Sequence, residues 1–368
     1  MSAAGPLRLA LLGGGAIARS VHLPLLRAMP GVQIVAVADA DERLRQEAVR
    51  LAGETARPLA DYRDALALPE VEAVVVALPT NLHAAAASAA FAAGKHVYLE
   101  KPIAGNVEEA RRLLDAWSQA SECIGMVGFN YRFNPLYTRL RQRLDAGAVG
   151  ALTAVRSVFA TPTANALPDW KRRTESGGGV LLDLASHHID LLRFFTGREI
   201  AEVSAMALSQ RSEEDSALIN LRLRAVGGAT AVAQILVSLC AADDDRWEFY
   251  GDGGRLAVDR YESVEARFLP ARRQDVSPLS GLQNLLAELP RLSYRLEKRR
   301  SPAHEPSYGV AISRFVAACR SVREGEGRAV RTHPAVSPDL TDGFQSLRVI
   351  EAAKESIHSG GKAVVLEI

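Results

Sequence analysis

The chain has 368 residues, enough for two domains and a large buried core. Lys and Arg total 44 and Asp and Glu total 43, so the formal net charge is +1. A charge this near zero argues against a nucleic-acid-binding protein, which needs a basic surplus. The 3 cysteines are far apart with no Cys-x-x-Cys pair, which excludes a disulfide scaffold and a structural zinc module.

The chain shows no sign of a targeting or membrane-spanning segment. Its first residues run directly into a strand-like segment, so we expect no signal peptide. The apolar stretches are shorter than the roughly 20 residues that span a bilayer. These features favour a cytoplasmic protein without a membrane or nucleic-acid partner.

The first third of the chain alternates apolar β-branched runs with helical patterns. Continuous apolar runs separated by helices are typical of a parallel sheet covered on both faces, which is a doubly wound α/β domain. We expect strands at 7–12, 32–38, 71–78, 96–99 and 123–129, and helices at 16–29, 40–51, 83–93 and 107–120.

The pattern changes after residue 129. Strand signals follow one another from 200 to 258 with no helix between them, and Gly227-Gly228 predicts a hairpin turn. This half should be a second α/β domain with a large, mostly antiparallel sheet. We expect its other elements to be helices at 135–145, 180–195, 307–322 and 339–359, and strands at 151–159 and 363–368.

Residues 270–306 are the least regular segment. Leu282, Leu285, Leu286 and Leu289 recur at helical spacing, and the segment closes with Lys298-Arg299-Arg300. A surface helix with a solvated basic end is the simplest interpretation. A lid, an oligomer contact and a membrane-surface contact are the alternatives.

A glycine-rich turn joins the first strand to the first helix. Residues 13–18 read Gly-Gly-Gly-Ala-Ile-Ala, the G-x-G-x-x-A pattern. Gly13 permits the tight turn, Gly15 lets a pyrophosphate approach the backbone, and Ala18 keeps the helix close to the sheet. The free N–H groups at the helix start then favour phosphate. The pattern predicts a dinucleotide site.

Asp39 ends the second strand, about 20 residues beyond the glycine turn, where an acid bonds the adenosine ribose hydroxyls. Its carboxylate would repel a 2′-phosphate, so the sequence favours NAD over NADP. Arg43 lies close enough along the chain to leave NADP as an alternative.

Polar residues also follow the third and fourth strands, at the edge where such sheets bind ligands. Glu100-Lys101-Pro102 follows the fourth strand and would bring Lys101 to the catalytic crevice. Pro79, Thr80, Asn81 and His83 follow the third strand. The alternatives are a solvated lysine and ordinary residues at a helix start.

A second polar concentration follows Gly177-Gly178-Gly179. Asp183 and His187 are four residues apart on an apolar helix, so they should share a face, where an Asp orients a His and stabilises its protonated form. The alternative is a structural pair. His188 points elsewhere and has no assigned role. The sequence contains no metal-ligand constellation, so we expect no metal.

These motifs together resemble the glucose–fructose oxidoreductase/inositol dehydrogenase/rhizopine catabolism (Gfo/Idh/MocA) family. The resemblance rests on the glycine turn, Glu100-Lys101-Pro102, the Gly-Phe-Asn-Tyr-Arg-Phe-Asn-Pro of residues 128–135, and Asp183 with His187. It implies an NAD(P)-binding Rossmann domain at 1–125 and a substrate-binding and oligomerisation domain at 126–368. Ala185 stands where the family usually has Gly. This difference affects how closely other groups can approach the backbone there more than it affects the expected chemistry.

The resemblance also implies roles. His187 would take the proton of a substrate hydroxyl while hydride passes to the nicotinamide, Asp183 would orient His187, and Lys101 would stabilise the alkoxide. Lys171 would add charge beside the substrate. The expected cofactor residues are Gly13, Gly15, Ala16, Ile17, Asp39, Arg43, Pro79, Thr80, Asn81, His83, Glu100, Lys101 and Asn130. The expected substrate residues are Lys101, Asn130, Arg132, Trp170, Arg172, Asp183 and His187.

The function that the resemblance implies is oxidation or reduction of a hydroxyl-bearing carbon of a sugar, cyclitol or sugar derivative with NAD(P). A homodimer or homotetramer would form through the C-terminal sheet. Two alternatives stay open. One is an NAD-dependent glycosidase or lyase that oxidises its substrate transiently, and the other is a dinucleotide sensor without turnover, which would need none of Lys101, Asp183 and His187.

Overall fold

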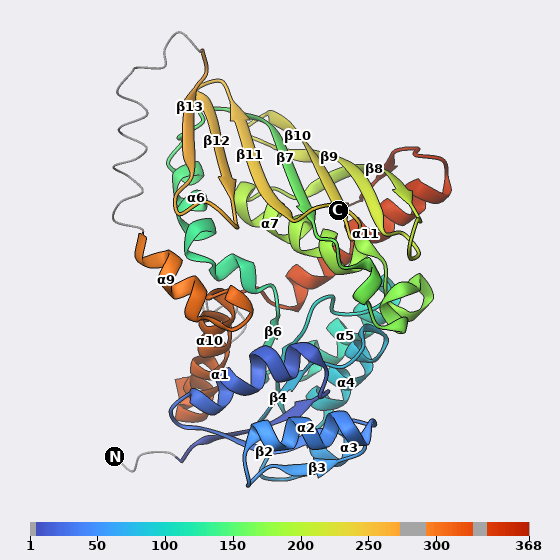
Figure 1. Cartoon of the computed structure of the whole chain (residues 1–368), viewed down its shortest axis with the longest axis vertical. Coiled ribbons are helices and arrows are strands. Elements are labelled where there is room, and N and C mark those ends of the chain that lie inside the picture. The colour runs from blue at the N-terminus through green and yellow to red at the C-terminus, as the bar shows by residue number, and fades with distance from the viewer. Residues whose placement is uncertain (1–4, 273–291, 327–336, 368) are drawn as a thin grey trace. The chain divides into compact units, whose positions relative to one another are not determined.

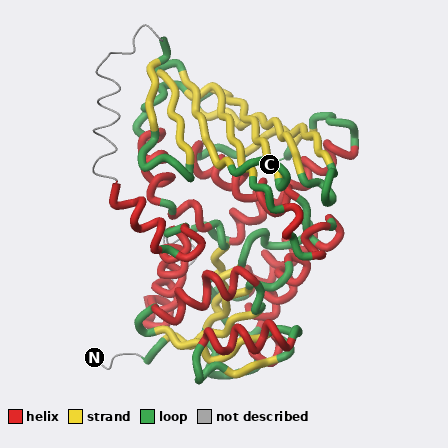
Figure 2. The backbone as a smooth tube through the Cα atoms, viewed as in Figure 1, coloured by secondary structure: helices red, strands yellow, loops and turns green. Residues whose placement is uncertain are grey.

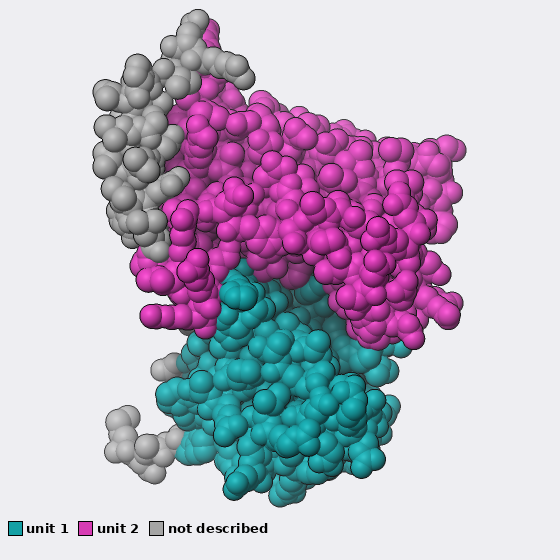
Figure 3. Space-filling model, viewed as in Figure 1, with its two compact units in different colours: residues 1–130, 301–345 teal, residues 131–300, 346–368 magenta. Residues whose placement is uncertain are grey.

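The computed structural model describes residues 5–272, 292–326 and 337–367. These residues fold into two compact units, 1–130 with 301–345 and 131–300 with 346–368, which Figure 3 colours separately. The domain boundary expected at residue 125 leaves 301–345 in the C-terminal domain, whereas the described residues of this segment belong to the first unit. Among the described residues, no helix is both long and apolar enough to cross a membrane.

The first unit contains a six-stranded parallel sheet with the order β3-β2-β1-β4-β5-β6 (Figure 1). The strands other than β3 are mostly apolar and largely buried, as expected where helices cover both faces of a parallel sheet. The strands are β1 (Leu7–Leu12), β2 (Val32–Ala38), β3 (Arg57–Leu59), β4 (Ala73–Val76), β5 (His96–Leu99) and β6 (Gly125–Val127). The predicted doubly wound sheet is confirmed.

Most helices of this unit connect one strand to the next, and a further helix comes from a later part of the chain. A π-helical turn, Ala18–His22, leads into α1 (Leu23–Ala28). The next helices are α2 (Glu42–Ala52), α3 (Tyr62–Leu66), α4 (Thr80–Ala92) and α5 (Val107–Gln119). From the end of the chain, α10 (Ser307–Ser321) packs on this sheet, where its Phe315 meets Tyr98 of β5 edge to face, with ring centroids 5.7 Å apart.

The second unit contains an eight-stranded sheet with the order β13-β12-β11-β7-β10-β9-β8-β14. Its described pairings are antiparallel except β7 with β10, as predicted for a mostly antiparallel sheet. Gly227 and Gly228 have φ of 60° and 82°, which suits the predicted hairpin between β9 and β10. The strands are β7 (Leu152–Ala160), β8 (Ile200–Leu208), β9 (Ser216–Val226), β10 (Ala229–Ser238), β11 (Asp244–Gly251), β12 (Gly254–Asp259), β13 (Arg267–Pro270) and β14 (Val364–Val365).

Helices α6 (Pro135–Asp145) and α7 (Ser186–Thr196) lie on one face of this sheet (Figures 1 and 2). Phe195 of α7 joins them to it, because its ring packs against Tyr137 of α6 and against Trp247 and Phe249 of β11. These aromatic pairs form part of the core of the unit.

Two further helices contain residues of this unit. The long α11 (Leu340–His358) contributes residues to both units, and α9 (Leu292–Arg300) carries the basic end expected at 298–300. Lys298 donates to the backbone oxygens of Arg260 and Tyr261, so this end is tied to the second unit. The leucines of the predicted helix at 282–289 lie outside the described residues.

Candidate active site

The glycine turn lies between β1 and the first helix, and its geometry explains its composition. Gly13 has a φ of 100°, and a Cβ there would come within 2.4 Å of the Ala77 carbonyl oxygen, so only glycine fits. A Cβ on Gly15 would meet nothing within 4 Å, so open space lies above this residue. Ala16 and Ile17 open the helix that follows. The turn forms a cradle of the kind that accepts a pyrophosphate.

Asp39, at the end of β2, is held against this turn. Its Oδ2 accepts the Gly14 N–H at 2.7 Å and its Oδ1 accepts the Asp41 N–H at 2.9 Å. These bonds fix the carboxylate where the sequence predicts the ribose partner. Arg43 forms an i,i+4 ion pair with Glu47 at 2.8 Å, and Arg19 also pairs with Glu47. Arg43 therefore has an acidic partner on its own helix.

The residues after β4 take two kinds of position. Pro79 precedes α4, and Thr80 and Asn81 form its first turn, with Thr80 buried and Asn81 exposed. His83 is buried, and its Nδ1 and Nε2 lie 2.6 Å and 2.7 Å from the carbonyl oxygens of Pro102 and Leu78. Burial lowers the pKa of His83 although both carbonyls favour the protonated ring. The His83 side chain thus ties the end of β4 to the turn after Lys101.

The Glu100 side chain is bonded inside the first unit. Its Oε1 lies 2.8 Å from Nε2 of His22, which is fully buried in the π-helical turn beyond the glycines. Burial alone would raise the pKa of Glu100, but the His22 hydrogen bond and the nearby Lys101 charge hold it below its ordinary value. The pair connects the dinucleotide helix to the residue before Lys101. The resemblance places Glu100 among the cofactor residues and does not include His22, which only its polar character within an apolar helix could have indicated.

Lys101 follows β5 and is half-buried, with a cis peptide bond to Pro102. Asn130, beyond β6, is buried and donates from Nδ2 to the Ser307 hydroxyl at 2.9 Å. This bond joins the residues after β6 to the start of α10 within the same unit. The carboxyl ends of the parallel strands thus carry Asp39, Lys101 and Asn130, as predicted.

In the second unit, Asp183 and His187 lie on one continuous helix with a change of winding between them. Leu181–Ala185 is π-helical and leads directly into α7 at Ser186. Such wider turns recur at functional sites, because they displace side chains from ordinary helical register. His187 is buried and Asp183 is partly exposed. Ala185, in the position where glycine is usual, is buried within the π-helical turn.

Lys171 is the ion partner of Asp183. Its Nζ lies 3.0 Å from both carboxylate oxygens. The glycine triplet makes this approach feasible, because a Cβ on Gly178 would come within 2.3 Å of the Lys171 carbonyl oxygen. The Gly179 N–H donates to that oxygen at 3.3 Å. The triplet therefore docks the Lys171 loop against the start of the helix that carries Asp183.

Trp170 and Arg172, the sequence neighbours of Lys171, have contacts of their own. Trp170 is half-buried, and Lys171 Nζ lies 5.6 Å from the centre of its ring. Arg172 donates to the backbone oxygens of Ala164 and Arg211, so it fastens the loop. Trp170 stays a predicted wall of the substrate site.

Arg132, another predicted substrate residue, forms a bidentate pair with Asp190 of α7. Its Nε lies 2.8 Å from Oδ2 and its Nη2 lies 2.5 Å from Oδ1, and both side chains are almost fully buried. Arg132 also lies over the Phe194 ring at 5.6 Å. The pair anchors α7 to the segment after Asn130, which sequence spacing did not indicate.

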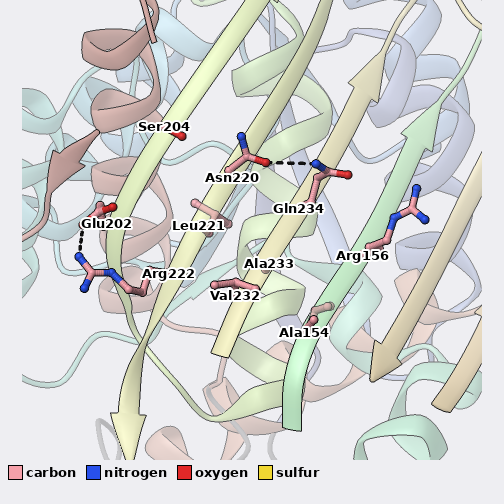
Figure 4. A pocket seen from close by; sticks show the side chains of 11 residues that line it. Ala154, Arg156, Glu202, Ser204, Asn220, Leu221, Arg222, Val232, Ala233 and Gln234 are labelled. Atoms are coloured by element: carbon pink, nitrogen blue, oxygen red, sulfur yellow. Dashed lines mark hydrogen bonds and ion pairs between the residues drawn. The ribbon is translucent and has the colours of Figure 1, made fainter. Parts of the chain in front are cut away.

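The described residues contain no group of three or more potential metal ligands close enough to hold an ion. A shallow hollow lies elsewhere, on the sheet face opposite α6 and α7 (Figure 4). Asn220 and Gln234 are hydrogen-bonded across it, Glu202 pairs with Arg222, and Val232 is exposed in its floor. It contains none of the predicted catalytic residues.

Two family models together match most of the chain. The oxidoreductase family model with an NAD-binding Rossmann fold matches residues 7–129, and the GFO/IDH/MOCA C-terminal domain model matches 137–257. The chain belongs to the Gfo/Idh/MocA family. It is an NAD-binding oxidoreductase, and within that class a dehydrogenase or reductase.

Known relatives span most of the chain. A dTDP-3,4-didehydro-2,6-dideoxy-alpha-D-glucose 3-reductase from Actinomadura kijaniata is 30% identical over 74% of this chain and 81% of its own. An inositol 2-dehydrogenase from Rhizobium meliloti is 26% identical over 95% and 96%. Among solved structures, the WlbA dehydrogenase from Bordetella pertussis, in complex with NADH and UDP-GlcNAcA, superposes with a TM-score of 0.80 at 22% identity over 99% of each chain. This last likeness confirms the fold.

Proposed function

We propose that this enzyme oxidises or reduces one hydroxyl-bearing carbon of a sugar, cyclitol or sugar derivative with NAD. The observation that carries the proposal is the Lys171–Asp183 pair, with Asp183 on the same continuous helix as His187, in a chain that also has the dinucleotide turn and Lys101. The named relatives act on dideoxy sugar nucleotides and on inositol, which supports this substrate class.

The residues of the first unit fit the cofactor. Open space above Gly15 and the tight turn at Gly13 suit a pyrophosphate, and Asp39 is fixed beside them for the ribose. Bound NAD supplies the acceptor for the hydrogen and two electrons that leave the substrate carbon. We propose NAD in preference to NADP because Asp39 would repel a 2′-phosphate, whereas Arg43 is paired with Glu47.

His187 is the proposed general base. It accepts the proton of the substrate hydroxyl as the carbon is oxidised to a carbonyl, and it returns the proton in the reverse direction. Asp183 stabilises the imidazolium so formed, and Lys171 holds that carboxylate in place. Lys101 stabilises negative charge on the reacting oxygen. The proton and the electron pair are thus both accounted for.

Three basic residues near the proposed site bear on whether the substrate carries a negative charge. From the sequence alone, Arg132, Lys171 and Arg172 leave an acidic or phosphorylated sugar, or a sugar nucleotide, open as the substrate. In the structure Arg132 and Lys171 have acidic partners, and Arg172 is bonded to backbone oxygens. None of the three charges therefore requires an anionic substrate.

The direct test is absorbance at 340 nm with purified protein, NAD or NADP, and a panel of sugars, cyclitols, uronic acids and nucleotide sugars. A substrate-dependent rise with NAD supports the proposal and identifies the substrate. Absence of any rise, with NAD binding confirmed by calorimetry, would contradict net dehydrogenase turnover.

We further propose that the open sheet face is where copies of this chain assemble into a dimer or tetramer. Large apolar side chains lie exposed on β8, β9, β10 and β14, a feature typical of interfaces. They are Met206, Leu208, Val226, Val232, Leu236 and Val365. Light scattering of the wild type and of Val232→Lys tests this, and an unchanged mass in the variant would argue against assembly through this face.

A further inference from the structure

The second unit contains a buried ion pair that the proposed mechanism does not use. Arg260, just after β12, donates from Nε to Oδ2 of Asp245 in β11 at 2.6 Å, and both side chains are buried. Tyr137 of α6 donates its hydroxyl to Oδ1 of Asp245 at 2.8 Å. Burial alone would raise the pKa of Asp245, but the Arg260 charge and the neighbouring His188 hold it well below its usual range.

The Arg260 guanidinium also lies against an aromatic ring. Its Cζ is 4.6 Å from the centre of the Tyr131 ring, which is cation–π distance. Tyr131 belongs to the Gly-Phe-Asn-Tyr-Arg-Phe-Asn-Pro segment, of which only Asn130 and Arg132 are expected from the sequence to bind cofactor or substrate. Its ring is almost fully buried, so its orientation is set by packing and by this cation.

The same Tyr131 ring packs on the proposed catalytic base. Its centre is 4.6 Å from that of the His187 imidazole, with the planes tilted by 33°. Phe159 of β7 flanks the cluster, 6.2 Å from the His187 ring and 5.7 Å from the Arg260 Cζ. Asp245, Arg260, Tyr131 and His187 thus form a continuous series of contacts within one unit.

We propose that Tyr131, oriented by the buried Arg260–Asp245 pair, is a positioning residue that holds the His187 imidazole for proton transfer. The inference rests on the proposed function of His187. A base must present one nitrogen to the substrate hydroxyl, and a displacement of about 1 Å can cost about 100-fold in rate. Ring packing restricts rotation of the imidazole without occupying either nitrogen, which a hydrogen bond would do.

The test compares Tyr131→Phe, which keeps the ring, with Tyr131→Leu, which removes it. The first readout is the NMR signal of the His187 ring in the protein without substrate, assigned by its loss in His187→Gln. We expect a ring-current shift in wild type and Tyr131→Phe, and its loss in Tyr131→Leu. An unchanged His187 signal in folded Tyr131→Leu would overturn the inference.

The second readout is kinetic, on the substrate found in the 340 nm screen. Tyr131→Leu should lower kcat by about 10- to 100-fold with KM for NAD unchanged, and Tyr131→Phe should restore it. Arg260→Lys keeps the charge beside Asp245 but lacks the planar guanidinium, and should give an intermediate loss. Wild-type kcat in Tyr131→Leu would refute the inference. The NMR result stands without any substrate, so failure of the proposed function and failure of this inference are distinguishable.

Discussion

Lys171 donates to both carboxylate oxygens of Asp183, each at 3.0 Å. The aspartate expected to orient His187 is therefore also held by a cation from the loop that the glycine triplet docks. A carboxylate with this partner is fixed in place. The loop and the helix consequently act as one site.

The Lys171 side chain should be needed for turnover and not for cofactor binding. Lys171→Met should lower kcat by about tenfold or more, because Asp183 loses its anchor; this is less than the roughly 10²- to 10⁴-fold expected of a proton-transfer residue. Lys171→Arg, which keeps the charge, should recover much of the loss. Steady-state kinetics with NAD affinity measured in parallel check this, and equal kcat in all three proteins would contradict the role of Lys171.

Lys101→Met should lower turnover by about 10²- to 10³-fold while the Kd for NAD changes little, because the ammonium stabilises charge that develops on the reacting oxygen. Circular dichroism and NAD calorimetry provide the folding and binding controls. A variant with wild-type turnover would remove Lys101 from the mechanism.

Asp39→Ala should weaken NAD binding and narrow the preference for NAD over NADP, because the ribose loses its acceptor and a 2′-phosphate loses its repulsion. Asp41→Ala is the matched control. Asp41 caps α2 by accepting the Leu44 N–H at 2.9 Å, so its loss should cost about 1 kcal/mol of stability without changing cofactor preference. The ratio of the two cofactor affinities, measured by calorimetry, tests the assignment; an unchanged ratio in Asp39→Ala argues against it.

His96 should make stability fall in mild acid. Its Nδ1 accepts the Ile124 N–H at 3.1 Å, and burial lowers its pKa from 6.5 to about 4 despite the opposing charge of Glu72. The unfolded chain then binds a proton more readily than the fold, so stability is lost as the pH falls from about 6.5 to about 4, by up to about 3 kcal/mol.

The measurement is urea unfolding at about pH 7.5 and about pH 5 for wild type and His96→Gln, in which the amide oxygen can still accept the Ile124 N–H. The variant should lose less free energy of unfolding between the two pH values. An equal loss in both proteins would show that His96 is not the responsible group.

Much of the fold was predictable because the strands of the first unit are buried on both faces and have continuous apolar runs. The strand at 7–12 and the helix at 135–145 have the predicted bounds. By contrast, β3 and α3 were missed, because three residues that include Pro58 carry no periodicity. The π-helical turns also have no local signature, so the change of winding between Asp183 and His187 could not be foreseen.

The site was predictable where a motif follows a strand end and not where distant residues meet. Asp39 and Lys101 follow this rule. His22 and Glu100 are 78 residues apart, and Arg132 and Asp190 are 58 apart, so only the tertiary fold pairs them. Arg132 seemed free to bind substrate because its partner lies on another element, and the same is true of Lys171.

The account depends most on one claim, that His187 transfers the substrate proton in an enzyme that binds NAD through the first unit. The most direct measurement is the rate of NADH formation at 340 nm for wild type and His187→Gln, with NAD affinity determined on the same samples. We predict equal affinity and a rate lower by about 10²- to 10⁴-fold in the variant. An equal rate in both proteins would contradict the claim.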